Sequence, residues 1–110
     1  MKLQMRDRLV LLNILPAEGD ITTIKIVHRL KMELAPSEKE VADYNIKQEK
    51  GQVIWDDARE KKIGAQEKKI GPKAYSIIEE AFEKLSKDKK INEGHLETFM
   101  KFSPDEKEEE

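Results

Sequence analysis

The sequence predicts a single, mainly helical α+β domain with one β-hairpin or small antiparallel sheet. Three observations lead to this prediction. The chain has 110 residues, which is the size of one domain. Apolar residues recur at helical spacing in several segments separated by proline, glycine or capping residues. Residues 46–55 differ, because they combine a central glycine with a Val-Ile-Trp run that favours a strand.

The first helix is expected over residues 3–15, where leucines recur at helical spacing. Its apolar face is broad, so we expect it to be central to the core. Three charged residues near its start are expected to lie on the opposite side: Arg6, Asp7 and Arg8. Pro16 and Gly19 end this helix.

Two further helices are predicted by their capping residues. Asp20 can cap a helix that continues to Leu34 and is stopped by Pro36. Ser37 and Glu40 have the spacing of a capping box, which predicts a short helix ending near residue 44 or 45.

Residues 46–55 are expected to form a β-hairpin around Gly51. The basic segment 59–73 then contains Glu-Lys-Lys-Ile-Gly twice. We expect the second copy to be strand-like and to lie beside residues 53–55, and the first copy to be a helix end or a loop that stops at Gly64.

Two helices complete the predicted domain, which spans residues 1–102. Pro72 is suited to the first turn of a helix over residues 72–85. Asn92 can cap a last helix that ends near Phe102. The acidic residues 103–110 are expected to form a disordered tail.

Composition and motifs give no indication of catalysis. The chain has no cysteine, and neither His28 nor His95 has a second histidine at metal spacing. It also lacks a glycine-rich phosphate loop and a nucleophile elbow. We therefore expect a non-enzymatic protein without metal or cofactor. The apolar run over residues 9–15 is too short to span a bilayer, so we expect a cytoplasmic protein without a membrane partner.

The order helix, helix, short helix and hairpin over residues 3–56 resembles a winged helix-turn-helix, with residues 46–55 as the wing. This resemblance implies nucleic-acid binding or transcriptional regulation. Under that alternative, phosphate contacts would come from Lys25, His28, Arg29, Lys47, Lys50, Lys61, Lys62, Lys68 and Lys69. The short helix opposes DNA reading, because it carries Glu38, Glu40 and Asp43 against only Lys39.

The segments LLNILPAEGD, IVHRLKMEL, GQVIWD and INEGHLETFMKF resemble small uncharacterised proteins encoded by bacteriophages and prophages. This resemblance implies a phage accessory protein that modulates a host protein. The leading hypothesis is therefore a protein–protein interaction module, with Tyr44, Trp55 and Phe102 as candidate contact residues. A third hypothesis is a small-molecule or nucleotide sequestering protein, which would need a basic pocket, expected at an oligomer interface.

Overall fold

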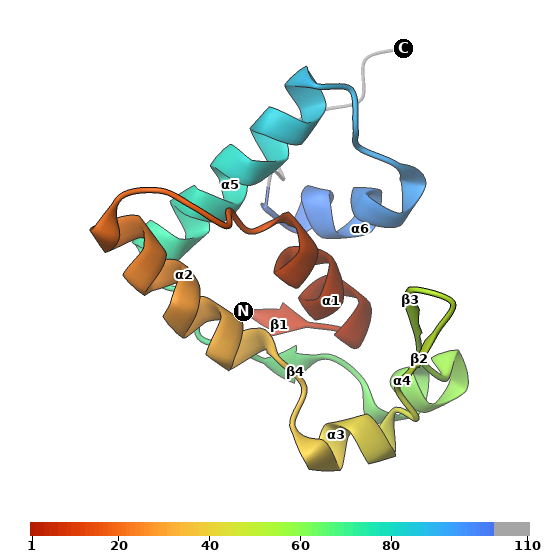
Figure 1. Ribbon diagram of the computed structural model, residues 1–110. Helices are drawn as coiled ribbons and strands as arrows, with labels where there is room; N and C mark the ends of the chain where they lie inside the picture. Colours follow the sequence, from red (N-terminus) through yellow and green to blue (C-terminus); the bar gives the residue numbers. More distant parts are fainter. Residues whose placement is uncertain (103–110) are drawn as a thin grey trace.

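A computed structural model describes residues 1–102, in which helices predominate and the strands form two small antiparallel sheets (Figure 1). The predicted fold class, a single α+β domain with a hairpin, is confirmed. Residues 103–110, the predicted tail, lie outside the described residues. In chain order the elements are β1 (Lys2–Leu3), α1 (Met5–Ile14), α2 (Ile21–Leu34), α3 (Glu38–Asp43), β2 (Lys47–Glu49), β3 (Gln52–Ile54), α4 (Asp57–Ile63), β4 (Gln66–Glu67), α5 (Pro72–Lys87) and α6 (Glu93–Phe102).

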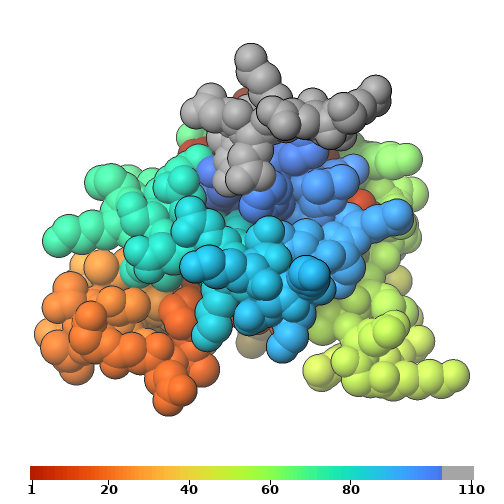
Figure 2. Space-filling view, turned by 90° about the horizontal axis from the view of Figure 1, so that it is seen from above, coloured from red at the N-terminus to blue at the C-terminus, as the bar shows by residue number. Residues whose placement is uncertain are grey.

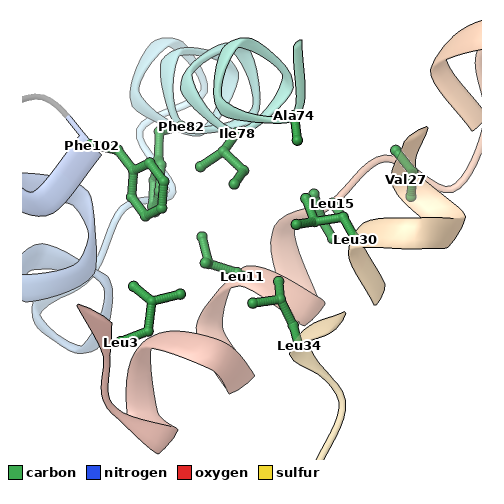
Figure 3. Packing of buried hydrophobic residues seen from close by; sticks show 10 residues of the cluster. All are labelled: Leu3, Leu11, Leu15, Val27, Leu30, Leu34, Ala74, Ile78, Phe82 and Phe102. Atoms are coloured by element: carbon green, nitrogen blue, oxygen red, sulfur yellow. The ribbon is translucent and has the colours of Figure 1, made fainter. Parts of the chain in front are cut away.

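Helix α1 lies at the centre of the molecule and packs against α2, α5 and α6. Leu11 of α1 and its C-cap, Leu15, belong to a cluster with side chains from all three helices and from β1 (Figure 3). The cluster consists of Leu3, Leu11, Leu15, Val27, Leu30, Leu34, Ala74, Ile78, Phe82 and Phe102. Burial of this apolar surface is the main term that stabilises the fold.

The β2–β3 hairpin forms where the sequence predicted it. Lys47 pairs with Ile54, and Glu49 pairs with Gln52. The two turn residues, Lys50 and Gly51, have φ angles of 51° and 77°. Two consecutive positive φ angles are typical of the type I′ turn, whose twist matches that of the flanking strands.

The second Glu-Lys-Lys-Ile-Gly copy does not lie beside residues 53–55, so that prediction was wrong. Only Glu67 of this copy lies in a strand, β4, which pairs instead with β1, where Lys2 faces Glu67. The Lys68 N–H also donates to the Met1 carbonyl at 2.8 Å. The reason is α4, which separates the hairpin from β4 along the chain. The first copy ends α4, and Gly64 forms its C-cap with a φ of 79°.

The charged residues Asp7 and Arg8 are buried, contrary to the expected solvent side of the first helix. Helix α1 is covered by α2, α5 and α6, so its first turns have little solvent-facing surface. Asp7 accepts a hydrogen bond from the Thr98 hydroxyl at 2.7 Å and forms an ion pair with Lys101. It also accepts from the Gln4 N–H at 2.9 Å, which caps α1. Asp7 therefore joins the start of α1 to α6.

Arg8 joins α1 to the end of α2 and to α3. Its Nε donates to the Leu34 carbonyl at 2.9 Å, and one Nη donates to the Ala35 carbonyl at 3.1 Å. The guanidinium also makes a bidentate pair with the Glu40 carboxylate. The last carbonyls of a helix lack intrahelical partners, so Arg8 satisfies groups that would otherwise be unpaired. The Arg8 side chain that makes these hydrogen bonds is fully buried.

We predict that Arg8→Met destabilises the protein by about 3 kcal/mol, because it leaves Glu40 and two carbonyls without their buried donor. Urea unfolding measures this loss. The matched control is Arg6→Met, because the Arg6 side chain is more exposed and, among residues 1–102, makes only long ion pairs with Asp57 and Glu97. It should cost less than about 1 kcal/mol. Equal losses in the two variants would contradict the role of Arg8.

We also predict a specific acid sensitivity at Glu40. Hydrogen bonds from Arg8, aided by the Ser37 N–H, lower the pKa of Glu40 from 4.5 to about 2 despite its partial burial. A lowered pKa stabilises the fold above the unfolded-state value, and that stability is lost as the pH falls from about 4.5 to 2. Over this range the wild type should lose about 2 to 3 kcal/mol more than Glu40→Gln. Parallel pH profiles of the two proteins would refute this.

Candidate functional site

The β2–β3 hairpin projects from the helical body and leaves a groove beside it (Figure 2). The groove has a volume of about 780 Å³ and runs between the hairpin, α1 and the start of α6. Its apolar lining comes from Leu9, Val10, Leu12, Val53 and Trp55. Its polar lining comes from Arg6, Asn13, Gln48, Gln52, Asn92 and His95. Such a mixture of an apolar surface with a few polar groups is typical of binding sites.

Trp55 is held at this groove by a buried carboxylate. Its indole N–H donates to Glu60, and the same carboxylate accepts from the Arg6 N–H at 3.2 Å. Glu60 is only 6% exposed, and it lies on α4, whose first turn is capped by Asp56. The Asp56 N–H in turn donates to the Tyr44 carbonyl at 3.0 Å. The base of the hairpin is therefore fixed, and Trp55 is the one candidate contact aromatic that lines the groove.

Tyr44 and Phe102 do not serve as surface contacts, because both are buried. They are 2% and 1% exposed, respectively. Phe102 packs against Tyr75 and Phe82, with ring centroids 5.1 and 6.2 Å apart. Burial, together with the nearby Glu40 carboxylate, raises the pKa of the Tyr44 phenol. Aromatic rings have a large apolar surface, so their burial contributes strongly to the core. The chain has few aromatic residues, and these two lie in its interior.

The cationic candidates lie in two groups on opposite sides of α1 (Figure 1). One group comes from the hairpin and α4: Lys47, Lys50, Lys61 and Lys62. The other comes from α2 and the segment after β4: Lys25, His28, Arg29, Lys68 and Lys69. These candidate residues therefore come from two separate parts of the fold.

The residues of α1 and of the hairpin that line the groove were not predicted from the sequence. Leu9 and Leu12 were assigned to the apolar face of the first helix, and Val53 was used only as an indicator of a strand. Nothing in their spacing distinguishes a leucine in the core from one in a groove. Only the position of the hairpin beside α1 shows that Leu9, Leu12 and Val53 line one groove.

Residues 1–102 contain no group of three or more side chains placed to hold a metal ion. His28 is exposed on α2, and His95 lies at the groove, where its Nδ1 accepts a long hydrogen bond of 3.4 Å from the Asn92 N–H. None of the described helices is both long and apolar enough to cross a membrane.

Comparison with known proteins gives no relative. Neither the protein-family models, nor the curated proteins, nor the solved structures include a match to this chain.

Two tyrosines give a matched prediction about burial. The Tyr44 hydroxyl is buried without a hydrogen-bond partner among residues 1–102, whereas the Tyr75 hydroxyl donates to the Phe102 carbonyl at 3.0 Å. Tyr44→Phe should therefore be neutral or stabilise by up to about 1 kcal/mol, since it removes an unpaired polar group. Tyr75→Phe should destabilise by about 1 kcal/mol. Thermal and urea unfolding test both, and the reverse order would show that the Tyr44 hydroxyl has a partner in solution.

Proposed function

We propose that this protein is a non-enzymatic protein–protein interaction module that binds its partner in the hairpin groove. The observation that supports this proposal is a groove of mixed apolar and polar lining, whose outer wall is a hairpin with every strand residue exposed. Val53 and Ile54 are 42% and 41% exposed, although both are large apolar residues. Neighbouring strand residues point to opposite faces, so each face of β3 presents apolar surface.

The groove suits an apolar side chain inserted between β3 and α1. Trp55 is fixed by Glu60 and offers a rigid aromatic wall, a residue type that often contributes strongly to protein interfaces. A two-stranded hairpin alone is only marginally stable, so a partner that packs on both sides would stabilise it further. These features favour a short apolar segment of another protein as the occupant.

The charges near the hairpin turn indicate which kind of partner segment would bind. Lys47 and Lys50 are exposed and form no ion pair among residues 1–102. Glu49 is the only acid within the two strands and their turn. We therefore propose an apolar segment flanked by acidic residues, because opposite charges at the rim speed association. The resemblance to phage-encoded proteins makes host proteins the first candidates.

Nucleic-acid binding through the winged-helix half has less support. Its recognition helix would be α3, where Glu38 and Asp43 are exposed and Glu40 is occupied by Arg8. The division of the cationic residues into two groups also leaves no continuous strip for a phosphate backbone.

The test is capture of partners from host lysate by the purified protein, with and without nuclease. We predict a stoichiometric partner that survives nuclease and is lost with Val53→Glu, because a buried carboxylate would oppose apolar docking. The matched control is Met32→Glu, since Met32 is 70% exposed on α2, away from the groove. It should retain the partner.

Two outcomes would contradict this function. Capture that is equal for both variants would show that the groove is not the binding surface. Recovery of nucleic acid alone, lost with salt, would instead support the winged-helix alternative.

A further inference from the structure

A second cavity lies between α2 and the start of α5. These two helices lie on the opposite side of α1 from the hairpin (Figure 1). Its volume is about 550 Å³, within the range of small-ligand sites. Three elements of the chain contribute to it: the middle of α2, the segment after β4 and the first turn of α5. The lining residues are Ile26, Arg29, Leu30, Glu33, Lys69, Gly71, Pro72, Lys73 and Ala74.

Three cationic side chains converge on the rim of this cavity. Arg29 comes from α2, Lys69 precedes α5, and Lys73 lies in its first turn. All three are exposed, and none forms an ion pair with a residue in 1–102. Cations gathered around a concave surface concentrate positive potential there. Arg29 and Lys69 were predicted from the sequence as contacts to nucleic-acid phosphates. Lys73 was not, because only the fold places it at the same cavity as Arg29.

One acid opposes these charges without cancelling them. Glu33 lines the same cavity, and its Oε1 accepts from the Lys69 backbone N–H at 3.3 Å. The rim therefore keeps an excess of two positive charges. The hydrogen bond also ties the loop before α5 to α2, which fixes Lys69 relative to Arg29. The first turn of α5 adds a weaker potential of the same sign.

The remainder of the cavity suits an organic group. Ile26, Leu30, Pro72 and Ala74 supply an apolar surface beside the cations. A smaller hollow of about 400 Å³ shares Ile26, Pro72 and Lys73 with it and adds hydroxyls from Thr22, Thr23 and Ser76. The α2–α5 seam thus combines a cationic rim, an apolar surface and side-chain hydroxyl groups.

We propose that the α2–α5 cavity binds a small phosphate monoester that carries an organic group with apolar surface, with the phosphate between Arg29, Lys69 and Lys73. Arginine and lysine bind phosphate through charge-assisted hydrogen bonds. These three cations line one concave cavity that also offers apolar surface, which favours a small ligand over a nucleic-acid strand. The site lies in a single chain, so it needs no oligomer interface. It is also independent of the hairpin groove.

The experiment is an NMR titration of the full chain with adenosine 5′-monophosphate, ribose 5-phosphate, inorganic phosphate and adenosine as separate probes. We expect adenosine 5′-monophosphate to bind most tightly and to shift the amides of residues 26–33 and 69–76. Phosphate and ribose 5-phosphate should bind more weakly at the same residues, and adenosine weakest of all.

Three variants test whether the charged residues of the cavity bind the phosphate. Arg29→Gln and Lys73→Gln should each weaken adenosine 5′-monophosphate binding roughly tenfold, whereas Glu33→Gln should strengthen it. The matched control is Lys87→Gln, at the far end of α5 and outside the cavity, which should leave affinity unchanged. Val53→Glu should also leave it unchanged, which separates this site from the hairpin groove.

Several results would overturn the proposal. It fails if millimolar adenosine 5′-monophosphate produces no shifts at the cavity. It fails if Lys87→Gln weakens binding as much as Arg29→Gln, because binding would then be non-specific. The proposal also fails if adenosine 5′-monophosphate, ribose 5-phosphate and phosphate bind with equal affinity, because the organic group would then contribute nothing to binding. Tighter binding of a short single-stranded oligonucleotide, with shifts extending to the hairpin and α4, would replace the small ligand with nucleic acid.

Discussion

The rest of the structure depends on the buried guanidinium of Arg8. It reaches from α1 to the two carbonyls that end α2 and to the carboxylate that caps α3. Burial of a charge is unfavourable unless it is paired and hydrogen-bonded, and Arg8 meets that condition with partners on two other segments. The position of α2 relative to α1, and the direction in which the chain leaves α2, are both fixed by this one side chain.

Both candidate surfaces depend on this arrangement. Fixing the end of α2 against α1 supports the seam with α5, where Arg29 and Lys73 line the same cavity. Fixing the start of α3 directs the chain to Tyr44, whose carbonyl accepts from Asp56 at the base of the hairpin. Asp56 caps α4, and α4 carries the Glu60 carboxylate that holds Trp55. A short sequence of polar contacts therefore links the buried Arg8 to the exposed groove.

Local signals predicted the elements well, and their tertiary partners poorly. Asp20, Ser37 and Pro72 act within one helical turn, so the sequence alone located the starts of α2, α3 and α5. The burial of Asp7 and Arg8 depends instead on Thr98 and Glu40, which are distant in the chain. The pairing of β4 with β1 is equally non-local. For the candidate sites, Trp55 was identified because it is the single tryptophan beside the hairpin, whereas the burial of Tyr44 and Phe102 required the packed structure.

Native-state hydrogen exchange at α3 tests the role of Arg8 most directly. This helix has six residues, none of them buried, and a helix this short is unstable in isolation. The account predicts that the amides of Val41 and Tyr44, which donate to Ser37 and Glu40, are protected nearly as strongly as those of α1. It also predicts that Arg8→Met removes this protection from α3 before it affects α1. Exchange of α3 at the rate of a frayed helix in the wild type would contradict the account.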